Sequence, residues 1–165
     1  MSGFLDAIGN EPYLKAKFLK NVAAGEKASA AEFKMTIEEY PKVEVLVRTT
    51  QFPAMGRTDV EDFGQMGMGI NQQGPIENKG EIAVTCVETL TGPVIGMMRD
   101  IVRNKRYVTV KIEATPESTL GQAVDDLKFR LLMCKLRSDA IDLSTEDTSA
   151  LIKPSITVQY NWVDH

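Results

Sequence analysis

Histidine is almost absent from this 165-residue chain, which holds a single one, His165, as its last residue. A terminal side chain is rarely held in place, so His165 is hard to orient for the nucleophile–base pairs that hydrolases use. Histidine-based metal sites are disfavoured for the same reason. We therefore predict no catalytic residue, no metal site and no bound cofactor, which makes an enzyme the least favoured class of function.

Cysteine is nearly as scarce. Cys86 and Cys134 lie far apart, form no CxxC pair and have no histidine near them in sequence. Isolated cysteines of this kind are typical of an apolar core, and their use as free thiols suits a reducing compartment. We expect both side chains in the core.

Nucleotide motifs and a basic charge balance are also missing. The segment GMGINQ at 67–72 lacks the third glycine of a dinucleotide fingerprint, and no GxxxxGK[ST] occurs. The 19 basic and 23 acidic residues give a formal charge of −4 and a pI near 5.1. Such a balance does not neutralise phosphates, so we expect no tight binding of nucleic acid.

Targeting and membrane-spanning segments are not expected either. The N-terminal MSGFLDAIGNEPYLK has no basic start followed by an apolar run, so it does not resemble a secretory signal. The uncharged stretch 63–75 is rich in glycine and shorter than the roughly 20 apolar residues that a membrane span needs. We expect no membrane partner.

Carboxylates occur in adjacent pairs rather than in convergent sets. Neighbouring side chains of an extended chain point to opposite faces, so such pairs rarely meet at one atom. We interpret them as solvated surface: Glu38-Glu39, Glu61-Asp62, Asp125-Asp126 and Glu146-Asp147.

Alternating apolar and polar residues indicate strands from residue 32 onward. The runs 33–37 and 43–47 alternate on either side of Tyr40-Pro41, so we predict that they form a hairpin. Trp162 ends the last alternating run, which favours a core aromatic over a stacking platform. Further strands are predicted at 82–86, at 108–112, at 127–133 with a bulge or bend near Leu136, and at 156–162.

One amphipathic helix is predicted within TGPVIGMMRDIVRNKR, residues 91–106. Thr91 is its expected cap, and Pro93 suits its first turn. Arg103 and Lys105 lie where the negative end of the helix dipole favours cations. The apolar stripe that we expect to cover one face of the sheet comprises Val94, Ile95, Met98, Ile101 and Val102.

Six or seven antiparallel strands and one good helix predict a mainly β fold, an antiparallel β-sandwich or barrel with one packed α-helix. A chain of 165 residues fits one such domain. We assign residues 1–31 to an N-terminal arm and 32–165 to the barrel, with a long loop at 59–80 between its second and third strands. The arm has weak helical spacing, and it is either a segment that docks on a neighbour or an unattached end.

The stretch FGQMGMGINQQGP, residues 63–75, carries no charge in a chain of which 25% is charged. Its glycines would let the chain lie close to a neighbouring surface, and its methionines fill irregular apolar gaps. Glutamine side chains can form hydrogen bonds to backbone groups in an interface without placing charge in it. The alternative is a loop that stays mobile in every state. If the stretch is an interface, the candidate residues are Phe4, Leu5, Phe52, Met66, Met68, Ile70 and Gln72.

The segment AEFKMTIEEYPKVEVLVRTTQFPAMG at 31–56 predicts a strand, a turn, a second strand and a corner of small residues. A long excursion, GEIAVTCVE at 80–88, a helix and the closing SITVQYNW at 155–162 follow it. This order resembles that of the tail tube proteins of contractile-tailed bacteriophages. The resemblance covers about residues 32–162, and the segment 1–31 is longer than it implies.

The resemblance implies a tail-tube-like fold and a structural role in the virion. Six copies would form a ring, and stacked rings would form a hollow tube inside a contractile sheath, through which DNA passes into the host cell. The implied partners are other copies of the chain, the tail sheath protein, the baseplate and the tape measure protein. The implied location is the phage tail, after assembly in the host cytoplasm.

A ring of six such chains would carry −24 formal charges, since each copy carries −4. A negative bore would repel DNA phosphates and let DNA slide without specific binding. The lumen-facing candidates are Glu38, Glu44 and Glu113, which lie off the apolar faces of their predicted strands.

Two other functions fit the same sequence. The chain could be the tube subunit of a contractile injection or secretion system, which would pass protein instead of DNA. It could also be a monomeric β-barrel that binds a small apolar ligand, in which case it would stay monomeric at all concentrations.

Overall fold

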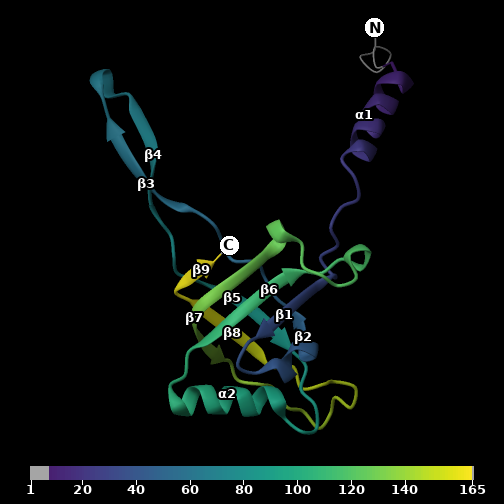
Figure 1. The fold of residues 1–165 in the computed structure, drawn as a ribbon, viewed down its shortest axis with the longest axis vertical. Coiled ribbons are helices and arrows are strands. Elements are labelled where there is room, and N and C mark those ends of the chain that lie inside the picture. The colour runs from purple at the N-terminus through teal and green to yellow at the C-terminus, as the bar shows by residue number, and fades with distance from the viewer. Residues whose placement is uncertain (1–7, 165) are drawn as a thin grey trace. The chain divides into compact units, whose positions relative to one another are not determined.

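The structure is a computed structural model that describes residues 8–164. The chain divides into two compact units, Met1–Ala30 and Ala31–His165. The first unit contains helix α1, Glu11–Ala23, and the second contains the strands and helix α2 (Figure 1). The interface candidates Phe4 and Leu5 lie outside the described residues.

Helix α1 is held by its own sequence signals. The side chain of Asn10 accepts a hydrogen bond from the backbone N–H of Tyr13 at 3.2 Å, and a proline occupies the first turn. None of its residues is buried within the described chain. The sequence of this segment has only weak helical spacing. The exposed apolar side chains are Tyr13, Leu14, Phe18, Leu19 and Val22.

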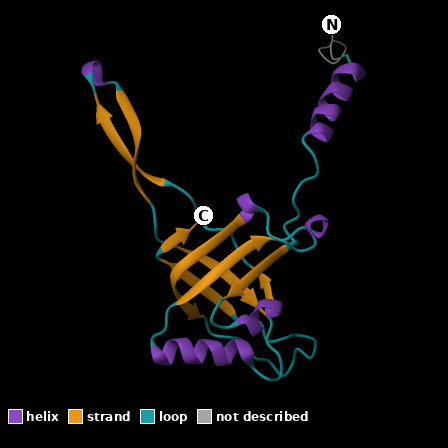
Figure 2. Cartoon of the chain, in the orientation of Figure 1, coloured by secondary structure: helices purple, strands orange, loops and turns teal. Residues whose placement is uncertain are grey.

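Seven strands of the second unit form one antiparallel sheet (Figures 1 and 2). The sheet is nearly closed and barrel-like, although among the described residues its outermost strands, β1 and β2, do not pair with each other. The predicted mainly β, tail-tube-like fold is confirmed. The strand order is β1 (Phe33–Ile37), β6 (Val108–Ala114), β7 (Lys128–Ser138), β8 (Ser155–Tyr160), β5 (Gly80–Cys86) and β2 (Val47–Thr49), and β9 (Trp162–Asp164) pairs with β7.

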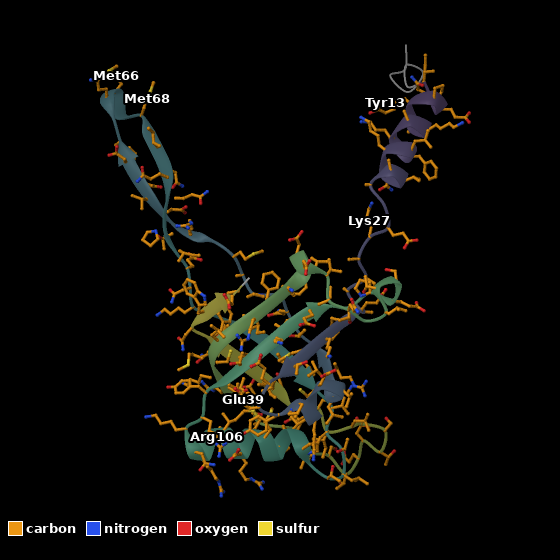
Figure 3. All side chains as sticks on the ribbon, in the orientation of Figure 1. Tyr13, Lys27, Glu39, Met66, Met68 and Arg106 are labelled. Atoms are coloured by element: carbon orange, nitrogen blue, oxygen red, sulfur yellow. The ribbon has the colours of Figure 1, made fainter. Side chains whose placement is uncertain are left out.

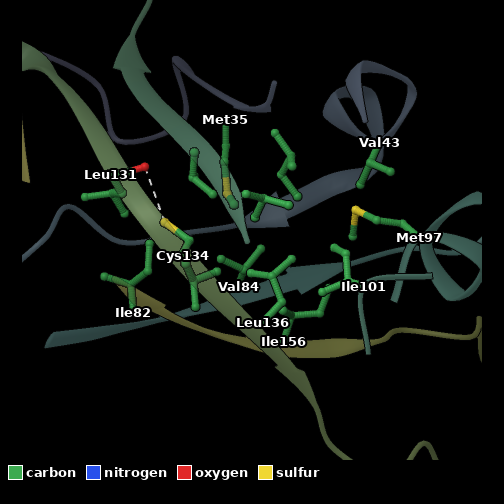
Figure 4. Packing of buried hydrophobic residues seen from close by; sticks show 14 of the residues in the cluster. Met35, Val43, Ile82, Val84, Met97, Ile101, Leu131, Cys134, Leu136 and Ile156 are labelled. Carbon is green, nitrogen blue, oxygen red and sulfur yellow. Dashed lines mark hydrogen bonds between the residues drawn. The ribbon is translucent and has the colours of Figure 1, made fainter. Parts of the chain in front are cut away.

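Alternation along the strands places one face of the sheet in the core. In β6 every second residue is buried, and the residues between them are half-buried. Side chains from both halves of the sheet meet those of α2 in one cluster (Figure 4). Burying each aliphatic side chain of this kind contributes roughly 1.5–3 kcal/mol, so this cluster is the main stabilising element of the unit.

Helix α2, Pro93–Asn104, begins after Gly92, whose φ of +68° is in the left-handed region. The predicted cap, Thr91, is wrong. The carboxylate of Glu88 accepts hydrogen bonds from the backbone N–H groups of Val94 at 3.3 Å and Ile95 at 2.7 Å. A carboxylate at this end also complements the helix dipole.

The predicted stripe of α2 is correct only in part. Val94, Met98 and Ile101 are buried as expected, and Met97 joins them. Val102 is 64% exposed, which contradicts its place in the stripe. The buried face is rotated toward Met97 because α2 packs over both β7 and the short 3-10 helix η2, Pro41–Leu46.

The predicted hairpin of residues 33–47 is wrong. Strand β1 pairs with β6, and β2 pairs with β5. Between them Pro41 starts η2, since its fixed φ suits a helical first turn and it offers no N–H to a sheet. Val43 is buried but Val45 is 78% exposed, so the valine alternation does not mark a strand face.

Strand β7 bends at Met133, whose φ of +53° is in the left-handed region. Its first half pairs with β6 and β9, and its second half pairs with β8. The bend interrupts the alternation of buried and exposed residues at Met133, which is earlier than the predicted site near Leu136. It turns Met133 outward and Cys134 inward.

The last predicted strand is divided in two. Asn161 separates β8 from β9, and its N–H donates to the carbonyl of Leu132 at 3.2 Å. Because of this break, Trp162 is 44% exposed, and its prediction as a core aromatic is wrong. The connection before β7 contains two short 3-10 turns, η4 (Glu117–Thr119) and η5 (Asp125–Leu127).

The Glu88 cap gives the first testable prediction. Glu88→Ala leaves the N–H groups of Val94 and Ile95 without their acceptor, so we expect a loss of about 1–2 kcal/mol in the free energy of unfolding. Chemical denaturation of the variant and of an exposed control, Glu81→Ala, measures the difference. Equal stability of the two variants would show that the cap contributes nothing.

Both cysteines are free and buried, as predicted. Burial raises the pKa of Cys86 to about 11 and that of Cys134 to about 12. Since the thiolate is the reactive form, we expect neither thiol to react with Ellman's reagent at pH 8 in the folded protein. Both should react once denaturant unfolds the chain. Rapid labelling of the native protein would contradict this core.

Candidate assembly surfaces

Residues 59–80, predicted as a loop, consist mostly of a β-hairpin. Strands β3 (Arg57–Phe63) and β4 (Gly69–Ile76) pair only with each other and form a separate two-stranded sheet. Every residue of β3 is exposed, and in β4 only Gly74 is half-buried. An isolated two-stranded ribbon is marginally stable in water. The hairpin therefore lacks a surface to pack on within the described chain.

Local contacts give the hairpin its shape. The hydroxyl of Thr58 donates to the carbonyl of Pro75 at 3.2 Å, and the guanidinium of Arg57 donates to the carbonyl of Gly74 at 3.2 Å. A Cβ at Gly74 would lie 2.7 Å from Val60 Cγ2 and 2.9 Å from the Thr58 carbonyl oxygen. Only glycine fits there without a shift of the opposite strand.

The tip of the hairpin presents apolar side chains without charge. It is closed by the 3-10 turn η3, Gln65–Gly67, in which Met66 has a φ of +61°. Met66 is 95% exposed and Met68 is 73% exposed, and Figure 3 shows both at the end of the hairpin. Ile70 and Gln72 are exposed along β4. Four of the predicted interface residues thus share one exposed element, and their role at an interface stays a prediction.

Phe52 differs from these four. It is 46% exposed, but its ring also packs against Phe129 of β7, with ring centroids 5.1 Å apart and planes tilted by 54°. Part of its apolar surface is therefore already buried by its own barrel.

The lumen-facing candidate Glu38 follows β1 and is engaged by cations of its own chain. The guanidinium of Arg130 donates to both carboxylate oxygens, at 3.1 and 3.2 Å, and Lys111 lies 3.8 Å away. The hydrogen bonds and charge of Arg130, with the charge of Lys111, lower the pKa of Glu38. Its negative charge is largely balanced where it lies.

The other two candidates also have cationic neighbours. Glu44 lies on η2 instead of a strand, and it pairs with Lys34 at 3.5 Å. Glu113 lies on β6, opposite Lys34 on one side and Lys128 on the other. Opposite charges on neighbouring strands attract. This face of the sheet therefore mixes both signs, and its orientation toward a bore stays a prediction.

A groove that was not predicted from the sequence lies between α2 and the end of β7. Its volume is about 740 Å³, and Val102 and Tyr107 are among its apolar lining residues. The register of β6 with β7 brings the two contributing segments together. Two clusters of basic residues in the sequence, at 99–106 and 135–137, were a signal that could have suggested it. We call this the basic groove, after its six cations: Arg99, Arg103, Lys105, Arg106, Lys135 and Arg137.

Within residues 8–164 no group of three histidine, cysteine or carboxylate side chains is placed to hold a metal ion. No helix in this range is both long and apolar enough to cross a bilayer.

No protein-family profile and no curated protein sequence matches the chain. Several solved structures match it in fold. A chain of the PVC sheath–tube complex in the extended state is 12% identical, with a TM-score of 0.60, and the match covers 88% of this chain and 95% of that one. The PVC sheath/tube terminator is 10% identical, with a TM-score of 0.64, and the match covers 84% of this chain and 96% of that one. The cap of the anti-feeding prophage is 12% identical, with a TM-score of 0.63, and the match covers 99% of this chain and 97% of that one.

The chain has the fold of a contractile-tail tube protein. The predicted resemblance to that family is thereby confirmed at the level of fold. Since the matches reach 84–99% of the chain, the tube fold accounts for the barrel and α2 together.

The crowding at Gly74 gives a prediction specific to the hairpin of this tube fold. Gly74→Ala places a methyl group against backbone as well as side-chain atoms, so we expect β3 and β4 to separate while the barrel keeps its stability. Hydrogen exchange should accelerate at residues 57–76 with little change in melting temperature. In Gly64→Ala the nearest atom lies 3.8 Å from the new Cβ, so this control should exchange like the wild type. Unchanged exchange in Gly74→Ala would contradict the predicted crowding.

Proposed function

We propose that the chain is a structural subunit of a contractile machine and acts by self-assembly into rings that stack as a tube. The observation that carries this proposal is the β3–β4 hairpin, which is exposed on both faces and, among the described residues, pairs with no other strand. A ribbon of this kind gains stability when it packs on another surface, and a neighbouring copy supplies one.

The apolar residues of the hairpin define how it would bind. Met66 and Met68 at the tip adapt to irregular surfaces, because methionine is unbranched and flexible. Burying one such side chain contributes roughly 1.5–3 kcal/mol. Gln72 can then bond to a neighbour's backbone without carrying charge into the contact.

The sheet edges support the same arrangement. Strands β1 and β2 are the outer strands of the barrel, with five and three residues. Unpaired strand edges in natural proteins are kept short or are covered by another element. A head-to-tail contact between copies would cover these edges, and such contacts close into rings when their rotation closes.

A six-membered ring, a surrounding sheath, a baseplate and a tape measure protein complete the proposed assembly. The similar structures support it, because they come from a sheath–tube complex and a baseplate of contractile injection systems. The cargo is DNA if the machine is a phage tail, assembled in the host cytoplasm as part of a virion, and protein if it is an injection system. A ring charge of −24 favours passage without tight binding of DNA.

A second candidate is a subunit that ends the tube. The match with the anti-feeding prophage cap spans 99% of the chain, whereas the sheath–tube match spans 88%. The match with the PVC terminator, also an end component, spans 84%. The wider match extends into the N-terminal unit. A repeating tube subunit should form long hollow rods when concentrated, and an end subunit should stop at single rings, which negative-stain microscopy distinguishes.

The hairpin tip provides the decisive variant. Met66→Lys with Met68→Lys places two cations in a contact that needs apolar surface, so we expect rings and rods to be lost in negative-stain images. The melting temperature of the dilute protein should change by no more than about 2 °C, because exposed substitutions have small effects on stability.

The matched control is Met66→Leu with Met68→Leu, which keeps the apolar surface and should assemble like the wild type. If the lysine variant assembles normally, the hairpin is not the contact. If the wild type stays monomeric at high concentration, the proposed function itself is wrong.

A further inference from the structure

The basic groove has a charge opposite to that of the whole chain. Six cations surround it and no acidic residue lines it, although the chain carries −4 overall. Among the described residues only Arg106 has an acidic partner, Asp100 at 3.6 Å. The other five cations form no ion pair within the described chain. A concentration of unpaired positive charge is available to an acidic ligand.

The lining of the groove distinguishes between acidic ligands. Val102 is 64% exposed and Tyr107 is 49% exposed, and both line the space between the cations. A phosphate backbone offers no apolar group to such surface. A peptide with both carboxylates and apolar side chains satisfies the cations and covers the apolar lining at once.

Among the acidic segments of the chain, one that also carries apolar side chains lies in the connection between β7 and β8. Residues 139–147, DAIDLSTED, hold four carboxylates and no basic residue. They form no helix or strand, and Leu143 is 77% exposed. The hydrogen bonds that the described structure gives to residues 140–151 are local, such as that from the Glu146 N–H to the Ser144 hydroxyl at 3.2 Å. Long connections without secondary structure are often functional.

The groove follows α2 from Ile95 to Tyr107 and reaches β7 at Arg137 and Ser138, next to Asp139, where the segment begins. Its cations Arg103, Lys105 and Arg106 lie at the C-terminal end of α2. The segment returns to the barrel near the N-terminal end, because the N–H of Glu88 donates to the carbonyl of Ile152 at 2.9 Å and Glu88 caps α2 (Figure 1). No residue of 139–147 lines the groove of its own chain. Since the segment does not cover the groove of its own chain, both surfaces are available to other copies, as a head-to-tail contact requires.

We propose that the basic groove of one copy binds residues 139–147 of the next copy. This inference rests on the proposed ring, since it names a second contact between neighbouring subunits in addition to the hairpin. Carboxylates of the segment pair with the groove cations, and Leu143 covers apolar lining next to Val102. The contact is electrostatic, so it should weaken as salt increases.

Charge reversal on either side tests the pairing. Arg103→Glu with Lys135→Glu gives a groove variant, and Asp142→Lys with Asp147→Lys gives a segment variant. We expect each variant alone to form no rings in negative-stain images, because like charges then face each other. An equimolar mixture should form rings again, since each reversed surface meets a partner of opposite charge on the other variant.

The control for the groove variant is Lys42→Glu with Lys79→Glu, which makes the same change in net charge as that variant at exposed lysines outside the groove. It should assemble like the wild type. Normal rings from either single variant overturn the inference, as does a mixture that fails to recover. Binding of a single-stranded oligonucleotide that only the groove variant loses, with ring formation unchanged, also overturns it and assigns the groove to nucleic acid.

A peptide measurement separates this inference from the proposed function. A fluorescent peptide of residues 138–152 is titrated with dilute full-length wild type and with the groove variant. We expect anisotropy to report binding that is about tenfold weaker for the variant. Peptide binding by a wild type that never forms rings supports the groove contact and refutes the proposed function. Ring formation by a wild type that does not bind the peptide supports the proposed function and refutes the groove contact.

Discussion

Burial of one face of a bent antiparallel sheet beneath α2 is the constraint on which the rest of the structure depends. The core needs side chains from β1, β5, β6, β7 and β8 together with Val94, Met97, Met98 and Ile101 of α2. The left-handed turn at Met133 lets β7 serve both halves of the sheet. The carboxylate of Glu88 holds the start of α2 in place.

This core leaves three elements without internal partners, and each has the chemistry of a contact surface. The β3–β4 hairpin exposes an uncharged apolar tip, the basic groove collects six cations of which only Arg106 has an acidic partner among the described residues, and residues 139–147 collect carboxylates. A barrel that was complete as a monomer would have no need of these surfaces.

Several features could be predicted because they depend on local sequence. Strict alternation at 108–112 and 156–160 marked true strands, and the uncharged stretch 63–75 pointed to Met66 and Met68 as exposed apolar residues. Other features could not. Val43 and Val45 alternate like residues of a strand, but they lie in a 3-10 helix that begins at Pro41 and buries Val43. The exposure of Trp162 depends on the break at Asn161, which no periodicity reveals.

The sequence by itself determined the mainly β class, the position of α2, the burial of both cysteines and the uncharged character of the hairpin tip. These follow from composition and periodicity, which act over a few residues. Only the tertiary structure decided which strands pair, that Glu38 and Glu44 are balanced by cations, and that residues 99–106 and 135–137 form one groove. These depend on register between segments far apart in the chain, where the free energy comes from burying a shared core and not from local preference.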